Sequence, residues 1–139
     1  MPRFTAALLI SLALAAPVRK AAAHPRLVNS TPTANAHVAV APVEISVTFN
    51  ENVTLALSKL TLLNATRQPV ALDSLRSGSD SSGGSKTFMA RTIGKLAAGR
   101  YTVKWQAAGS DGHPMRGEFS FVVDASAAAS KRPALAPRR

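Results

Sequence analysis

The chain contains no cysteine, which excludes disulfide bonds, cysteine-based zinc sites and thiol nucleophiles. It also lacks a hydrophobic run that could span a bilayer, because the apolar stretch 4–16 is shorter than the roughly 20 residues that a spanning helix needs. No G-x-S-x-G elbow, phosphate-binding loop or H-E-x-x-H motif occurs, so the sequence offers none of these enzyme signatures. The fold must therefore depend on its core, and histidine, carboxylate and methionine are the side chains left for metal chemistry.

The first 23 residues, "MPRFTAALLISLALAAPVRKAAA", are typical of a secretory signal, with a positive start, an apolar run and small residues at the end. Ala21 and Ala23 form an A-x-A cleavage pattern, and cleavage after it would make His24 the new amino-terminal residue. An earlier cut near Ala16 is the alternative, because basic residues directly before a cleavage site are unusual. The sequence predicts an exported domain over residues 24–124.

The formal net charge of +10 is concentrated outside that domain. Seven of the 17 basic residues lie in the predicted leader or in the tail: Arg3, Arg19, Lys20, Lys131, Arg132, Arg138 and Arg139. This leaves ten basic against seven acidic residues in 24–124. So small an excess does not indicate a nucleic-acid-binding patch. Residues 125–139 carry two prolines and no alternating pattern, and we predict a flexible basic tail.

Apolar and polar residues alternate with a period of two over residues 43–49, 101–107 and 117–123, which predicts half-buried strands. Shorter strand candidates separated by turn-rich pieces occupy residues 26–30, 58–64, 68–72 and 86–92. About seven strands without a convincing amphipathic helix predict an all-β fold, an Ig-like sandwich or a small Greek-key barrel. The Gly/Ser-rich segment Ser77–Ser85 is predicted to be a mobile loop.

The stretch "SDGHPMRGEFSFVV" places Asp111 and His113 two residues apart, ahead of an alternating strand. Side chains two apart on an extended segment point to the same side and can reach one ion. Pro114 disfavours helical angles at His113, and Gly112 gives the backbone freedom. A D-x-H pair alone is a weak signal, and its alternative is an ordinary pair on a surface loop.

A histidine at a free amino terminus offers its amine and Nδ1, which form a six-membered chelate ring around a metal. Pro25 has no backbone N–H, so copper cannot use a deprotonated amide of the second residue. The amine and imidazole of His24, the imidazole of His113 and the carboxylate of Asp111 would together supply three nitrogens and one oxygen. That set suits tetragonal Cu(II), whereas zinc would prefer a tetrahedron.

Other candidate ligands are fewer and more isolated. Glu51, at the end of the strand that begins near Val43, is either a direct ligand or a hydrogen-bond partner that holds the amine or an imidazole. His37 has no acid or histidine nearby in the sequence and is interpreted as a surface-loop residue. Of the methionines left after export, Met89 is assigned to the core and Met115 to a shield beside His113.

The segments "AHPRLVNSTP", "VEISVTFNENV" and "AGRYTVKWQAAGSDGHPMRGEFSFVV" resemble the CopC-like periplasmic copper-resistance proteins. The resemblance implies a cupredoxin-like Greek-key barrel that binds one Cu(II) in the bacterial periplasm through His24, Glu51, Asp111 and His113. Some members bind Cu(I) through a methionine-rich loop, but the matching segment "LLNATRQPVALDS" contains no methionine. Others are fused to a membrane copper importer, so an importer partner of this chain would be a separate protein.

Taken together, these patterns predict a monomeric, non-enzymatic Cu(II)-binding protein for copper sequestration, tolerance or delivery to an inner-membrane importer. One alternative is a copper oxidase-type enzyme that uses the histidine chelate, although a carboxylate in the coordination plane would occupy the position that oxygen needs. The other is a metal-free exported β-sandwich that serves in adhesion or assembly.

Overall fold

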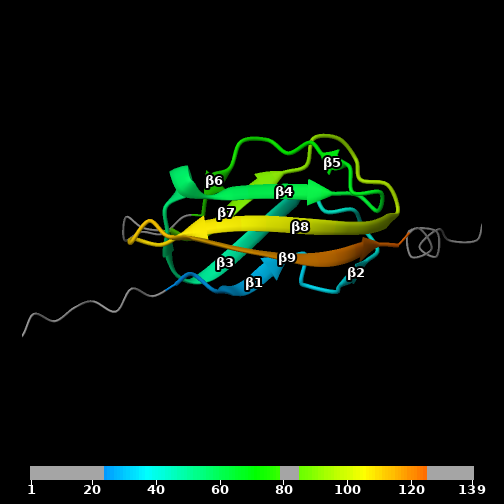
Figure 1. Ribbon diagram of the computed structural model, residues 1–139. Coiled ribbons are helices and arrows are strands. Elements are labelled where there is room, and N and C mark those ends of the chain that lie inside the picture. The colour runs from blue at the N-terminus through cyan, green and yellow to red at the C-terminus, as the bar shows by residue number, and fades with distance from the viewer. Residues whose placement is uncertain (1–23, 79–84, 125–139) are drawn as a thin grey trace, which may run out of the picture.

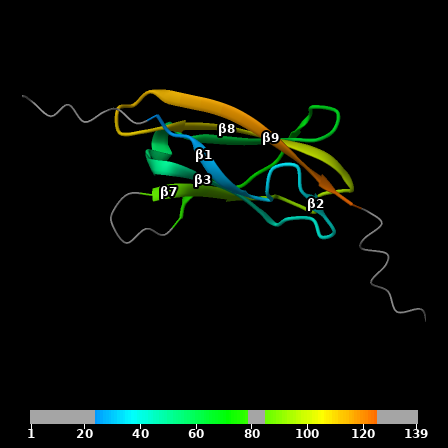
Figure 2. The same ribbon diagram turned by 90° about the horizontal axis from the view of Figure 1, so that it is seen from below.

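The computed structural model describes residues 24–78 and 85–124 as two β-sheets packed face to face (Figures 1 and 2). One sheet has four strands in the order β1 (Leu27–Thr31), β3 (Glu44–Val53), β7 (Ser85–Arg91) and β6 (Arg76–Ser77). The other has five in the order β2 (His37–Val38), β9 (Pro114–Val123), β8 (Gly99–Ala108), β4 (Lys59–Leu63) and β5 (Pro69–Val70). The predicted leader and tail, and the middle of the predicted loop at 77–85, lie outside the described residues.

The all-β prediction is confirmed, and each of the seven predicted strands is present. In the part of the chain that the structure describes, the helical content is one 3-10 turn, η1 (Leu55–Leu57), and no helix is long and apolar enough to cross a membrane. Strands β2 and β6 were not predicted. Each has two residues, too few for any alternation to show in the sequence.

The core lies between the sheets and is built from the inward-facing residues of the alternating strands. Buried aromatic and aliphatic side chains come from β3, β4, β7, β8 and β9; the largest fully buried ones include Phe49, Phe88, Phe121, Ile45, Leu62, Val47 and Val103. The rings of Phe49 and Phe88 stack across the four-stranded sheet with centroids 5.3 Å apart. Period-two alternation thus puts one face of each long strand into a shared core.

Two residues assigned to that core lie elsewhere. Val43 is exposed, because the strand begins one residue later, at Glu44. Met89 is only half-buried, because its neighbours Phe88 and Ala90 take the inward positions of β7 and turn Met89 to the outer face. The predicted alternation over 43–49 holds from Ile45 onward, and in β7 the inward positions fall on Phe88 and Ala90 rather than on Met89.

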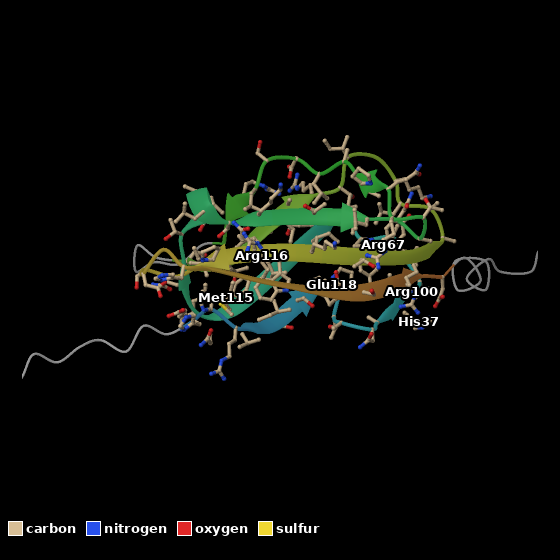
Figure 3. All side chains as sticks on the ribbon, in the orientation of Figure 1. His37, Arg67, Arg100, Met115, Arg116 and Glu118 are labelled. Carbon is tan, nitrogen blue, oxygen red and sulfur yellow. The ribbon has the colours of Figure 1, made fainter. Side chains whose placement is uncertain are left out.

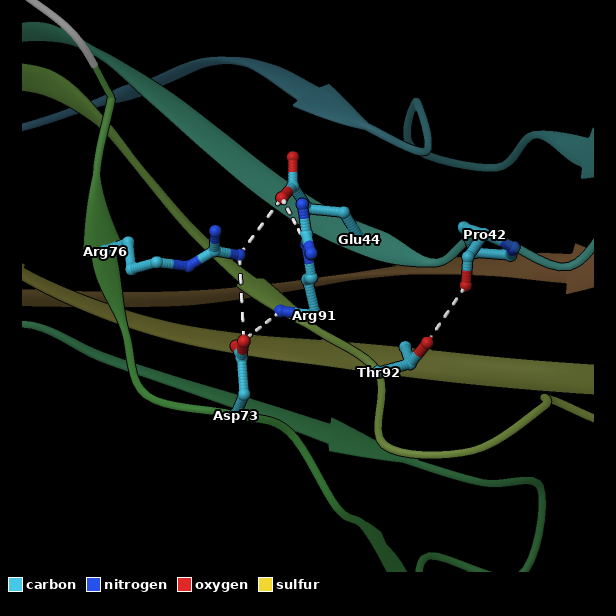
Figure 4. Close-up of polar contacts among 6 residues, drawn as sticks. All are labelled: Pro42, Glu44, Asp73, Arg76, Arg91 and Thr92. Atoms are coloured by element: carbon cyan, nitrogen blue, oxygen red, sulfur yellow. Dashed lines mark hydrogen bonds and ion pairs between the residues drawn. The ribbon is translucent and has the colours of Figure 1, made fainter.

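Charged side chains on the four-stranded sheet link short β6 to β3, beyond its neighbour β7, and to the segment before β6 (Figure 4). Arg76 lies 3.1 Å from the Glu44 carboxylate and 3.8 Å from that of Asp73. The backbone N–H of Arg91 donates to Asp73 at 2.6 Å. Because these groups are partly exposed, each ion pair contributes about 1 kcal/mol or less to stability.

The sandwich has two distinct ends (Figure 1). Strands β3 and β8 end where β1 and β9 begin, and we call this the site end. At the opposite end, called the groove end, lie segment 39–43 between β2 and β3 and segment 92–98 between β7 and β8. The described chain therefore starts at the site end and finishes, at Asp124, at the groove end.

Candidate metal site

The D-x-H pair lies in the loop between β8 and β9 at the site end. The predicted extended segment is instead a turn, closed by the Gly112 backbone N–H, which donates to the carbonyl of Gly109 at 3.1 Å. Gly112 has φ +75°, a left-handed conformation that favours glycine. The two side chains nevertheless lie together, with Nδ1 of His113 3.2 Å from Oδ2 of Asp111. The turn brings the two side chains together by a different backbone path from the one predicted.

Asp111 is held as an anion by its surroundings. The backbone N–H of His113 donates to Oδ1 of Asp111 at 3.1 Å and lowers the pKa of this carboxyl below its ordinary value. Partial burial opposes this shift, while the ring of His113 and the charge of His24 lower the pKa further. The Asp111 side chain is 19% exposed and that of His113 is 77% exposed, so the carboxylate forms the inner part of the pair.

The segment that begins at His24 is fixed beside the end of β3. Pro25 is fully buried and anchors this segment. The backbone N–H of Asn50 donates to the Arg26 carbonyl at 3.1 Å, and the Arg26 N–H donates to Oδ1 of Asn50 at 2.7 Å. His24 itself is exposed, and it lies close enough to Asp111 to contribute to the lowering of the pKa of that carboxyl. The buried proline therefore leaves the preceding histidine at the surface of the site end.

Glu51 follows Asn50 in β3 and is half-buried. Its Oε1 is fully buried and has no hydrogen-bond partner among the described residues. Directly after β3, the Thr54 N–H donates to the carbonyl of Ala108 at 2.8 Å, which joins the end of β3 to the end of β8. A buried carboxylate oxygen without a donor is costly, so this atom is suited to a cation or a donor that is supplied from outside.

The four predicted residues do not form a closed cluster. Over residues 24–78 and 85–124, no three or more His, Asp or Glu side chains lie close enough to hold one ion. Asp111 and His113 are in contact, whereas His24, in the segment before β1, and Glu51, near the end of β3, belong to other elements at the same end. In the uncleaved chain the nitrogen of His24 is a peptide amide bonded to Ala23, so the predicted chelate requires cleavage at that position.

His37 is not isolated, contrary to the sequence interpretation. It lies in β2 and its Nδ1 is 3.2 Å from Oδ2 of Asp124, a partner 87 residues away in the chain. The parallel pairing of β2 with the end of β9 brings the two together. The histidine is indeed exposed, and Figure 3 shows it at the groove end, far along β9 from Met115 at the site end.

The fold and the site together define a class of protein. It is a β-sandwich of two sheets with a histidine–carboxylate pair on a hairpin turn at one end. The chain belongs to the CopC domain family, whose family model matches residues 27–124. Copper resistance protein C of Pseudomonas syringae pv. tomato is 36% identical over 108 residues, which cover 74% of this chain and 82% of that protein. Copper resistance protein C of Escherichia coli is 37% identical over 111 residues, 74% of this chain and 83% of that protein.

Solved structures agree with these relatives. PcoC, described as a methionine-rich copper resistance protein from Escherichia coli, superimposes with a TM-score of 0.65 at 34% identity and covers 73% of this chain and all of its own. CopC from Methylosinus trichosporium OB3b has a TM-score of 0.63 at 29% identity and covers 73% of this chain and 94% of its own. By contrast with a methionine-rich protein, this chain has three methionines, and the two in the described residues, Met89 and Met115, lie on different sheets.

Proposed function

We propose that this chain is an exported, periplasmic copper-binding protein that holds one Cu(II) at the site end. The observation that carries the proposal is that the segment starting at His24 and the Asp111–His113 pair, distant in sequence, reach the same end of the sandwich. The names of the relatives as copper resistance proteins support the choice of metal. Cu(II) is also the strongest binder among divalent first-row metals for nitrogen and oxygen donors.

The proposed ligands are the amine and imidazole of His24, the imidazole of His113 and a carboxylate. Asp111 has both oxygens directed at His113, one on its backbone N–H and one on its ring. If its bond to Nδ1 persists with copper bound, Asp111 fixes the tautomer that leaves Nε2 free as the ligand atom. Glu51, with one oxygen buried and unpartnered, is then available as the carboxylate ligand.

In this proposal the bound copper is cargo, which the chain sequesters for tolerance or passes to a separate inner-membrane importer. The chain acts as a monomer and has no catalytic activity. A site that binds copper through several protein donors leaves little room for a reacting oxygen. A copper oxidase would instead leave one position of the copper open.

The test is native mass spectrometry of the protein recovered from the periplasm, with one equivalent of Cu(II) added. We expect a mass that begins at His24 and retains one copper, and His37→Ala as the matched control retains it too. A mass that begins elsewhere, with copper lost, would remove the chelate and favour the metal-free adhesion or assembly module. Ascorbate-driven peroxide production well above that of free copper would favour the oxidase.

A further inference from the structure

The groove end carries an apolar groove that the proposed copper function does not use. The groove has a volume of about 450 Å³ and lies between segments 39–43 and 92–98. Its walls are alanines with Leu96 and Val123, and the two charged groups that line it are Lys95 and Asp124. The chain leaves the described region from this wall, since Asp124 is the last described residue.

Three large aliphatic side chains on the two segments beside this groove face solvent. Val40 is 80% exposed, Val43 75% and Ile93 61%. Val40 lies between two alanines that line the groove, and the carbonyl of Val43 accepts the N–H of Thr92, next to Ile93. Single exposed aliphatic residues are ordinary on protein surfaces, but these three lie on two adjoining segments at one end of the sandwich and expose apolar surface there.

The charges at this end are predominantly positive. Lys95 lies on the groove wall, and Figure 3 shows Arg67 and Arg100 at the same end of the sandwich. Within residues 24–78 and 85–124, no carboxylate forms an ion pair with any of these three cations, whereas Asp124 is engaged by His37 at 3.2 Å. Residues 125–139, which continue from the groove wall, contain four basic residues and no acidic one.

We propose that the groove end docks on the surface of a lipid bilayer that contains anionic headgroups. Val40, Val43 and Ile93 would enter the boundary between headgroups and acyl chains, where apolar side chains are stabilised. The three cations and the basic residues after Asp124 would meet the lipid phosphates. A second copy of the chain fits this surface poorly, because it would bring two sets of like charges together.

Docking of this kind fixes the orientation of the molecule. The site end lies at the opposite pole of the sandwich (Figure 1), so it would face away from the bilayer and exchange its cargo with the surrounding solution. None of the residues in the docking surface is a proposed copper ligand. The proposal therefore stands or fails independently of copper binding, and it is tested on the metal-free protein.

The experiment is flotation of the exported chain, without copper, on vesicles of phosphatidylethanolamine with phosphatidylglycerol, compared with phosphatidylcholine alone. We expect binding to the anionic vesicles that weakens as salt rises toward about 1 M, where the screening length falls to about 3 Å. The variant with Val40→Ser, Val43→Ser and Ile93→Ser should bind at least about tenfold less. The matched control is Val28→Ser, which changes an exposed valine of β1 and should bind as the wild type does.

Four results would overturn the proposal. One is absence of binding to the anionic vesicles, and another is equal binding by the triple variant, which would leave the tail charges as the sole cause. A third is concentration-dependent dimerisation that the triple variant abolishes, which would make a second copy the occupant. The fourth is binding to an acidic polypeptide in solution without binding to vesicles. Unchanged thermal unfolding of the triple variant establishes that it is folded.

Discussion

The two ends of the sandwich each hold a histidine against an aspartate, and the two contacts are nearly the same. Nδ1 of His113 is 3.2 Å from Asp111, and Nδ1 of His37 is 3.2 Å from Asp124. Both histidines are well exposed, with 77% and 66% of their side chains accessible. By pair geometry alone, either end would qualify equally as the start of a metal site.

The two histidine–aspartate pairs differ in their surroundings. At the site end the buried Oε1 of Glu51 has no partner among the described residues, and His24 lies close enough to Asp111 to help lower its pKa. The corresponding surroundings at the groove end are alanines, Val123 and the cation Lys95, which repels a metal ion. We therefore propose a metal site only at the end where further unengaged donors lie near the histidine–aspartate pair.

The largest expected effect comes from pH. Copper competes with protons for imidazole nitrogens, whose reference pKa is about 6.5, so affinity should fall as pH decreases. Between pH 7 and about pH 5 we expect a loss of at least about 100-fold if two imidazoles bind. Because the pKa of Asp111 is lowered below its ordinary value of 3.8, this carboxylate stays ionised over that range and contributes little to the loss. Titration with a competing chelator measures it, and an affinity that stays constant to pH 4 would exclude imidazole ligands.

The next effect compares the two histidines directly. His113→Ala should weaken Cu(II) binding by at least about 100-fold, because loss of a hydrogen-bond partner behind a ligand already costs roughly 10–100-fold. His37→Ala removes the matching side chain at the groove end and should leave affinity unchanged. The single tryptophan, Trp105 in β8, provides a fluorescence signal for the titration. Equal losses in both variants would mean that the two ends do not differ as proposed.

Replacing Asp111 should change copper affinity less than replacing His113, and it tests the role of the carboxylate. Asp111→Asn keeps the shape but removes the charge, and we expect copper affinity to fall by roughly 10–100-fold if Asp111 orients His113. If Asp111 instead bound the metal directly, the change would also alter the electron paramagnetic resonance spectrum of the bound Cu(II). Asp124→Asn is the matched control, and any loss of affinity in it would contradict the assignment.

Glycines at the two ends are expected to resist substitution for different reasons. A Cβ at Gly117 would lie 2.4 Å from the ring of Trp105, so Gly117→Ala should lower the free energy of unfolding by about 1–3 kcal/mol. Gly94, in the segment between β7 and β8, has open space around it but φ +87°, and Gly94→Ala should cost about 1 kcal/mol. Urea denaturation followed by Trp105 fluorescence measures both, and no loss in Gly117→Ala would mean that the Trp105 ring moves aside freely.

The sequence predicted the long strands because period-two alternation records which face is buried, as in β3, β8 and β9. Strands β2 and β6 were missed because two residues are too few to show a period. The outward orientation of Met89 was missed because its neighbours Phe88 and Ala90 occupy the inward positions of β7. The Asp111–His113 contact was predictable because it is local. The His37–Asp124 contact arises only from the parallel pairing of β2 with β9, and the unpartnered oxygen of Glu51 depends on packing. Neither feature can be recognised from a local sequence pattern.

The smallest expected effect is that of Glu51→Gln. It should leave the metal-free protein at least as stable but weaken the binding of copper. Without copper, Glu51→Gln replaces a carboxylate that has one buried, unpartnered oxygen, so the free energy of unfolding should stay level or rise by up to about 1 kcal/mol. With copper, the same change removes a negative charge from the site end and should lower affinity by about tenfold or less. Thermal unfolding with and without one equivalent of Cu(II) measures both signs at once. A variant that loses stability without copper would show that Glu51 has a structural partner, and unchanged affinity would exclude it from the site.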